Sequence, residues 1–589
     1  MRHITFLIML LLLIAFGVAA QSPQAEQYFN TGTNLLTQQK DYDGAIANLT
    51  KAIELYPQYS IAYYNRAIAR RGKGDINGAI ADYTKAIQIN PRYAEAHFGR
   101  AIARDLNVDQ DGAILDYSIA IEINPRYAAA YYNRGLIRRL RGELDGAFSD
   151  FSNAIDINPN YEEALIARGL IYHERNNHAK AIEDYSSAIR VRPEDSLAYY
   201  DRGVAEQDIK EFTGAIADYS KAIQLNPKYT SAYFNRAYCK RSKGDIDGAL
   251  ADYSRIIEFN PDYVQAYTNR APILKEKGDL DGAIADYTKA VRIFPQDADS
   301  FLSRGNLKKQ KKDLDGALYD YNKVLEINPN YGAAYYNRSL IRSDRGDNDG
   351  AIQDLTKAIE IDPKDSDAYY ERALSRKRKG DINGAISDYT VAIELNPRSA
   401  SAYLSRGIAL EDKGDRSGAI ADYSKAIEIS PKYQQAYYNR GLTRYDQQDI
   451  DGAIADFSRA VEINPEYGYA YSGRCLAKKA KGDLANAIAD CTMAIGLLPR
   501  YAPSYNYRGL ARKTRGELDS ALADFSKAIE LNPNEGAYYG NRGLTYLMMG
   551  NDSLAEQDLA ACFRINNSLR SYYEGEAAKI RQKRGSQES

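Results

Sequence analysis

The sequence predicts an all-α protein, an α-solenoid in which antiparallel helix pairs follow one another along the chain. Fifteen of the 18 prolines stand 34 residues apart, from Pro57 to Pro533, with no insertion or deletion between them. A strict 34-residue period is typical of repeats built from a helix, a turn and a second helix. With these prolines at position 32, sixteen repeats run over residues 26–569.

The second repeat, residues 60–93, shows how each helix is expected to begin and end. A first helix is predicted at 60–73, and Gly74 after it can take the left-handed conformation that ends a helix. Asp75 offers a side-chain oxygen to the free amides of a second helix, predicted at 76–89. Every repeat has Asp, Glu or Asn at this position, so the helix pair is expected sixteen times.

Small residues recur where the two helices of a repeat face each other. Position 20 is Ala in all sixteen repeats, and position 8 is always Gly, Ala, Ser, Thr or Cys. Small side chains let two helices approach closely, and Tyr or Phe at positions 4 and 24 fills the space beside them. We therefore interpret the aromatic stripe as core.

This pattern resembles the tetratricopeptide repeat family over essentially the whole of 26–569. Tyr stands where the family often has Trp. The resemblance implies a right-handed superhelix of helix pairs whose concave groove binds peptide segments of partner proteins. It also implies that positions 2, 5, 6, 9, 12 and 13 of the first helices line this groove. In the second repeat the matching residues are Tyr63, Ala67, Ala79, Tyr83, Ala86 and Pro91.

An Arg at position 7 and an Asp at position 23 recur together in repeats 2 to 16. The first repeat has Gly32 and Asn48 instead, so both members are missing there. The two positions are symmetric about the turn, and we predict a semi-buried ion pair that fixes how the two helices dock. The alternative is that both side chains are exposed. Examples are the pairs Arg66 and Asp82, Arg134 and Asp150, and Arg338 and Asp354.

Three kinds of side chain are candidates for peptide contact in the groove. An Asn amide at position 6 can donate to and accept from an extended peptide backbone, as it does in several family members. Aromatic residues at position 5 and cations at position 12 favour acidic segments or carboxyl termini. The alternatives are local capping by Asn and a favourable effect of the cations on helix ends. The candidates are Asn65, Asn133, Asn235, Asn269, Asn337, Asn439, Asn541, Tyr132, Tyr336, Tyr438, Arg71, Arg139, Arg241 and Lys377.

Cys475 and Cys491 stand at positions 8 and 24 of one repeat, and position 24 is Tyr, Phe or Leu in every other repeat. Two departures at packed positions of the same repeat suggest a disulfide in an oxidising compartment. The alternative is a pair of small buried side chains. Cys239 and Cys562 are interpreted as structural.

The sequence lacks the motifs of catalysis. His173 and His178 are similar to a zinc-protease motif, but their five-residue spacing crosses the turn and is expected to point the rings apart. The repeats are flanked by 25 residues at the amino end and 20 at the carboxyl end, too few for a catalytic domain. The net charge of −2 gives no reason to expect nucleic acid. We expect no enzyme activity, no catalytic residue, no metal and no cofactor.

The amino-terminal residues predict export. A basic start, the apolar run 4–18 and Val18-Ala19-Ala20 indicate a signal peptide at 1–20, cleaved after Ala20. We expect a periplasmic or extracellular chain with no membrane span after cleavage, with a retained amino-terminal anchor as the alternative. The remaining predicted segments are a short linker at 21–25, the superhelix at 26–569, a capping helix at 570–584 and a disordered tail at 585–589.

Together these features predict an exported, non-enzymatic scaffold that binds proteins or peptides, including acidic segments, in its groove. The alternative is a structural envelope protein that self-associates through its Tyr-rich surface and has no separate ligand. Light scattering separates the two hypotheses, because only the second predicts oligomers that depend on concentration.

Overall fold

A computed structural model describes residues 22–588, so the predicted signal peptide at 1–20 and Ser589 lie outside the described residues. The described part of the chain contains helices and no strand, as the fold class predicted. None of its helices has the length and hydropathy needed to cross a bilayer. The chain divides into two compact units, one ending at Ile293 and the other beginning at Phe294.

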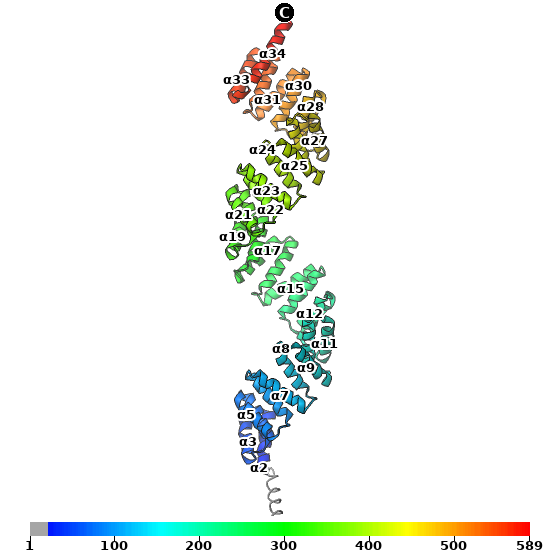
Figure 1. Cartoon of the computed structure of the whole chain (residues 1–589), viewed down its shortest axis with the longest axis vertical. Helices are drawn as coiled ribbons and strands as arrows, with labels where there is room; N and C mark the ends of the chain where they lie inside the picture. Colours follow the sequence, from blue (N-terminus) through cyan, green and yellow to red (C-terminus); the bar gives the residue numbers. More distant parts are fainter. Residues whose placement is uncertain (1–21, 589) are drawn as a thin grey trace, which may run out of the picture. The chain divides into compact units, whose positions relative to one another are not determined.

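The first unit consists of antiparallel helix pairs, one for each of the first eight repeats, that follow one another in chain order (Figure 1). Even-numbered α-helices are the first helices of the repeats, and odd-numbered ones are the second helices. The elements are α2 (Pro23–Asn34), the π-helix η1 (Leu35–Gln39), α3 (Tyr42–Leu55), α4 (Ser60–Lys73), α5 (Ile76–Ile89), α6 (Ala94–Leu106), α7 (Gln110–Ile123), α8 (Ala128–Leu140), α9 (Leu144–Ile157), α10 (Glu162–Glu174), α11 (His178–Val191), α12 (Ser196–Asp208), α13 (Phe212–Leu225), α14 (Thr230–Ser242), α15 (Ile246–Phe259), α16 (Val264–Glu276) and α17 (Leu280–Ile293).

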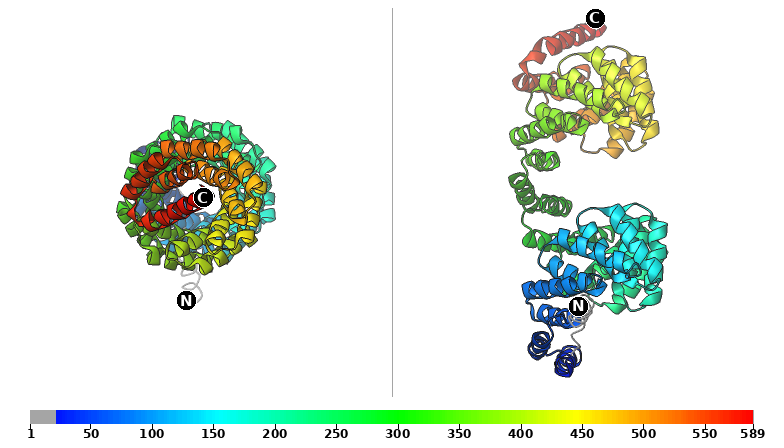
Figure 2. Two further views of the ribbon diagram at one scale, coloured as in Figure 1. Left: turned by 90° about the horizontal axis from the view of Figure 1, so that it is seen from above. Right: turned by 60° about the horizontal axis from the view of Figure 1, so that its bottom comes forward.

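The second unit repeats this arrangement and adds a carboxyl-terminal helix, drawn in red in Figure 2. Its elements are α18 (Ala298–Gln310), α19 (Leu314–Ile327), α20 (Gly332–Asp344), α21 (Asn348–Ile361), α22 (Ser366–Arg378), α23 (Ile382–Leu395), α24 (Ala400–Asp412), α25 (Arg416–Ile429), α26 (Gln434–Asp446), α27 (Ile450–Ile463), α28 (Gly468–Lys481), α29 (Leu484–Leu497), α30 (Ala502–Arg515), α31 (Leu518–Leu531), α32 (Gly536–Met548), α33 (Asp552–Ile565), the 3₁₀ helix η2 (Asn567–Leu569) and α34 (Arg570–Glu588).

The helix boundaries follow the residues that the sequence singles out. In the second repeat, α4 and α5 span the two predicted ranges. Gly74 adopts a left-handed φ of 88° between them, and the Asp75 carboxylate accepts a hydrogen bond of 2.9 Å from the Gly78 amide. The two helices of this pair are therefore joined by a turn that ends the first helix and caps the second.

Close packing at position 8 explains why that residue is small. A Cβ on Gly135 would lie 2.6 Å from the ring of Phe151, the residue at position 24 of the same repeat. In the same way, a Cβ on Gly203 would lie 2.9 Å from the ring of Tyr219. The buried ring at position 24 occupies the space that a larger side chain at position 8 would need.

Both ends of the repeat array correct the predicted boundaries. α2 begins at Pro23, so residues 23–25, predicted as linker, are helical. Ser22 accepts a hydrogen bond from the Ala25 amide, and Pro23 needs no partner in the first turn because it has no amide hydrogen. α34 continues to Glu588, so residues 585–588, predicted as disordered, have helical backbone. No proline interrupts this stretch, and one Gly in a helix costs only about 1 kcal/mol.

Candidate functional site

In each of repeats 2 to 16, the structure brings together the Arg of position 7 and the Asp of position 23. Arg66 donates to both carboxylate oxygens of Asp82, over 2.8 Å and 2.7 Å, and Asp82 is only 3% exposed. The same two bonds join Arg134 to Asp150 and Arg338 to Asp354. All fifteen of these Asp residues are buried. We call these pairs the Arg–Asp ladder. Its carboxylates lie in the interior.

The ladder has a third member that the sequence did not predict, a polar residue at position 25. The Arg66 guanidinium also donates to the Thr50 hydroxyl of the preceding repeat over 3.0 Å, and Arg508 donates to Thr492 in the same way. Position 25 is Ser, Thr or Asn in the first fifteen repeats and Ala560 in the last, which no repeat follows. That pattern was the signal for a bond between neighbouring repeats.

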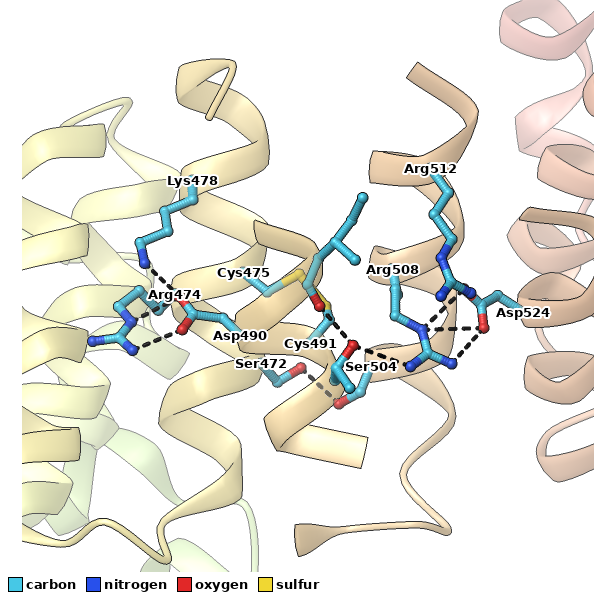
Figure 3. Close-up of a disulfide and its surroundings, with 12 residues drawn as sticks. Ser472, Arg474, Cys475, Lys478, Asp490, Cys491, Ser504, Arg508, Arg512 and Asp524 are labelled. Carbon is cyan, nitrogen blue, oxygen red and sulfur yellow. Dashed lines mark hydrogen bonds and ion pairs between the residues drawn. A yellow bond between two sulfur atoms is a disulfide. The ribbon is translucent and has the colours of Figure 1, made fainter. Parts of the chain in front are cut away.

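A second cation binds the buried Asp in ten repeats. This cation comes from position 11. In repeat 15, for example, Arg512 contacts Asp524 over 2.8 Å beside Arg508 (Figure 3). Position 11 therefore belongs to the ladder. Repeat 6 differs because Glu206 stands there and one of its carboxylate oxygens is buried without a partner. Burial, and then the nearby Asp218, raise the pKa of Glu206 to about 7.

Most of the candidate amides at position 6 are engaged inside the chain. Asn65 donates to the Thr33 hydroxyl over 3.0 Å, and Asn235 lies within 3.4 Å of two Tyr hydroxyls. Three others donate to the carbonyl four residues earlier in their own helix: Asn133, Asn269 and Asn337. The sequence left local hydrogen bonding of the Asn side chain as an alternative to peptide contact, and these five residues follow that alternative.

The two remaining amides differ from each other. Asn541 is buried, donates to Asn506 over 2.9 Å and accepts from Tyr573 of α34 over 3.1 Å. It is covered by the carboxyl-terminal helix, so its prediction as a peptide contact is wrong. Asn439 is half-buried, and its side chain makes no hydrogen bond within residues 22–588.

Three of the four candidate cations at position 12 form an ion pair with a carboxylate at position 13 of the next repeat. The pairs are Arg139 with Glu174 at 2.8 Å, Arg241 with Glu276 at 2.6 Å and Lys377 with Asp412 at 3.2 Å. Arg71 has no ion pair within the part of the chain that the structure describes. The predicted basic wall is therefore less basic than its sequence indicates.

The three candidate Tyr residues fall into two groups. The Tyr132 ring centre lies 5.0 Å from that of Tyr161, and the Tyr438 ring centre lies 5.4 Å from that of Tyr467, so both rings pack against the chain itself. Tyr336 instead lines a cavity of about 270 Å³.

This cavity, called here the acidic cavity, is also lined by Asp367, Tyr370, Glu371 and Ser399. Position 34, occupied here by Ser399, is Tyr in ten of the sixteen repeats, so the space of a missing ring helps to open the cavity. Burial raises the pKa of Glu371, and burial together with Glu371 and Asp367 raises that of Tyr336 to about 12. The cavity joins two aromatic walls to two carboxylates.

Lys479 and Lys513, the position-12 residues of two consecutive repeats, form what we call the basic patch. Neither has an ion pair among the described residues. Burial, and then the positive charge of Lys479, lower the pKa of Lys513 to about 8. Two neighbouring cations, neither of them in an ion pair, make this stretch of the first helices favourable to an anion, although the carboxylate of Glu576 in α34 also acts on Lys513.

Cys475 and Cys491 form a disulfide inside repeat 14 (Figure 3). It occupies the place that a small residue and a ring fill in other repeats. Tyr507, the one aromatic residue at position 6 in the whole sequence, packs against this disulfide from the next repeat. The ring lost at position 24 is thus replaced by one from the following helix. Cys239 and Cys562 are free and buried.

The expectation that His173 and His178 point apart is wrong. Their Nδ1 atoms lie 3.3 Å from each other, and Asp208 lies 3.4 Å from the other nitrogen of His173. The spacing argument assumed one continuous helix, whereas α10 ends at Glu174 and the turn brings His178 back towards it.

Comparison with known families gives matches along most of the chain. Models described as TPR repeat match residues 69–104, 169–209, 340–380 and 412–448. Models described as tetratricopeptide repeat match residues 25–59, 109–162, 196–229, 234–298, 298–331, 366–399, 435–467 and 502–535. A search of curated proteins found no match.

Three solved structures illustrate the similarity. The crystal structure of MamA is 31% identical with a TM-score of 0.27, and the match covers 27% of this chain and 94% of that one. YrrB, a TPR protein with an unusual peptide-binding site, is 24% identical with a TM-score of 0.30, over 32% of this chain and 97% of that one. A tetratricopeptide repeat protein from Parabacteroides merdae is 22% identical with a TM-score of 0.31, over 42% of this chain and 98% of that one.

Proposed function

Because the chain belongs to the tetratricopeptide repeat family, we propose that it is a non-enzymatic scaffold that binds protein or peptide partners. Binding takes place on the first-helix face, the surface formed by positions 2, 5, 6, 9, 12 and 13 of the repeats. One observation carries the proposal: interior positions are uniform while this face varies. Position 7 is Arg in fifteen repeats, whereas position 6 is Asn in only seven and is otherwise Asp, Glu, Gly, Ala, Ser, Thr or Tyr.

The basic patch supports binding of an acidic segment near the carboxyl-terminal repeats. The Lys513 ammonium is partly removed from water and repelled by Lys479, so a carboxylate placed between the two would relieve both penalties. Ammonium groups bind carboxylates through short, charge-assisted hydrogen bonds. We therefore place the acidic preference at these two lysines and not at Arg139, Arg241 or Lys377, which already have carboxylate partners.

The acidic cavity supports the opposite preference. Two Tyr rings and two carboxylates suit the side chain of Lys or Arg, which gains from both the ring faces and the negative charge. Both features belong to the second unit. A partner segment that carries acidic and basic residues in different places fits them better than a uniformly acidic one.

Fluorescence anisotropy with two labelled peptides of equal length, one rich in Glu and one rich in Lys, tests the proposal. The double variant Lys479→Glu/Lys513→Glu is expected to weaken binding of the acidic peptide by about tenfold or more, since it replaces attraction by repulsion. The control Lys527→Glu reverses an exposed charge on a second helix and should leave binding unchanged. Equal binding by parent and double variant would overturn the assignment of the acidic preference.

Self-association without a separate ligand is the alternative function. Light scattering of the chain beginning at Gln21 distinguishes the two, because a discrete monomer at all concentrations supports the scaffold. Oligomers that grow with concentration support the structural role.

Export remains part of the proposal. It is supported by the amino-terminal sequence and by the disulfide between Cys475 and Cys491, since disulfides persist in oxidising compartments. Cell fractionation with a thiol count tests it. We expect the chain in the exported fraction with two free thiols, whereas a cytoplasmic chain with four would contradict it.

A further inference from the structure

Repeat 5 supplies two of the four His residues of the chain, one on each side of its turn. α10 ends next to His173, and α11 begins at His178. Asn176 between them has a left-handed φ of 57°, which lets a short turn reverse the chain. As a result the two Nδ1 atoms lie 3.3 Å apart, with the rings nearly perpendicular at 73°.

The next repeat contributes Asp208 at the end of α12. Its carboxylate lies 3.4 Å from Nε2 of His173. A carboxylate at this atom favours the tautomer with the proton on Nε2, which leaves the lone pair of Nδ1 facing His178. Arg139 and Glu174 are paired in the same register one repeat earlier, so the repeat architecture itself holds Asp208 in place.

The surrounding charges leave this cluster accessible. Glu174 is bound to Arg139 at 2.8 Å, and Arg175 is bound to Asp145 at 2.5 Å, so neither occupies the space between the two imidazoles. The side chains of His173 and Asp208 are 26% and 42% exposed. A hydrated ion can therefore reach the two Nδ1 atoms from solvent.

We propose that His173 and His178 bind one divalent transition-metal ion through their Nδ1 atoms, with Asp208 orienting the ring of His173. A tetrahedral ion with metal–nitrogen bonds of about 2.0–2.1 Å holds two nitrogen ligands about 3.3–3.4 Å apart. The observed separation of 3.3 Å agrees with this range. Imidazole nitrogen suits Zn²⁺, Ni²⁺ and Cu²⁺, and water completes the coordination.

A bound ion would have a structural consequence. It would join the end of α10 to the beginning of α11 and, through Asp208, would strengthen the contact between repeats 5 and 6. An ion that binds only the folded chain raises its stability by mass action. Added Zn²⁺ is thus expected to raise the thermal midpoint.

Calorimetric titration with ZnCl₂ tests the proposal. The full chain is prepared without a His tag and is freed of metal by a chelator. We expect one ion per chain. The variants His173→Arg and His178→Gln should abolish binding, and both keep the fold because the chain itself has Arg139 and Gln110 at the same repeat positions. Asp208→Asn should weaken binding by about 10–100-fold, as expected for the loss of an outer-shell partner.

Asp412→Asn is the matched control, since Asp412 occupies the same position in repeat 12 but faces Lys377 and no His. It should bind Zn²⁺ as the parent does. His97 is buried against Asp116 and the Pro91 carbonyl, so it offers no second site of this kind. Absence of binding to the parent, or undiminished binding by His178→Gln, would overturn the proposal.

Discussion

The Arg–Asp ladder and the first-helix face share the first helices of the repeats but carry different information. At the ladder, one arrangement recurs through the repeats, with buried carboxylates held by one or two cations. On the face, neighbouring repeats differ in charge and in ring content, from the acidic cavity to the basic patch. The comparison shows that the positions repeated in every hairpin fix how its two helices pack. The positions that vary between repeats are those that can distinguish one partner from another.

The largest expected effect comes from breaking one pair of the ladder. Asp354→Leu leaves Arg338 and Arg342 without the carboxylate that they share, which should lower the free energy of unfolding by about 3–5 kcal/mol. The double variant Arg338→Leu/Asp354→Leu should recover part of this loss. Urea unfolding measures all three. If the two single effects simply add, the pair has no coupling and the ladder is not an energetic unit.

An exposed carboxylate serves as the control for that measurement. Asp349 lies on α21, the helix that carries Asp354, and pairs at the surface with Lys379 at the end of α22 in the next repeat. Asp349→Asn should change the free energy of unfolding by no more than about 0.5 kcal/mol, since exposed ion pairs contribute little.

The next effect concerns repeat 14, where a disulfide replaces the usual ring. Reduction should lower the free energy of unfolding by about 3 kcal/mol, the loop-closure value for a bridge that spans 16 residues. Urea unfolding with and without reductant measures this. Cys239 and Cys562 are free, so the reductant acts on no other bond among the described residues. An unchanged midpoint would show that packing of Tyr507 alone holds this repeat.

A smaller effect is expected at repeat 6, where the ladder is altered. Because the pKa of Glu206 is raised to about 7, the folded state favours its uncharged form. The contribution of Glu206 to stability should therefore be most favourable below about pH 4.5 and should fall as the pH rises to about 7. Glu206→Gln should remove this contribution, which solvent screening of the half-buried carboxylate reduces to about 1 kcal/mol at pH 8. Thermal unfolding across this range measures it, and Glu122→Gln at an exposed position of another repeat should leave the profile unchanged.

Much of the fold follows from the sequence because sixteen copies display the same constraints. Pro57, Gly74 and Asp75 mark where helices begin and end, and the second repeat forms helices over the predicted ranges. The pairing of positions 7 and 23 also follows from symmetry about the turn. The position-25 hydroxyl escaped notice because its partner lies in a different repeat.

The candidate site was harder to predict, for physical reasons. The sequence shows that Arg139 and Asn541 lie at face positions, but not that a carboxylate of the next repeat or a helix end covers them. The two His were misjudged because a turn, and not a continuous helix, sets the direction of their rings. Contacts within a repeat could be predicted from the sequence, whereas contacts supplied by a neighbouring repeat could not.

The most direct test of the division between ladder and face is amide hydrogen exchange of the full chain with and without the acidic peptide. If the first helices bind the peptide, new protection should appear in α26, α28 and α30, around the basic patch, while α27, α29 and α31 exchange as before. New protection confined to those second helices, or none in either set, would contradict the account.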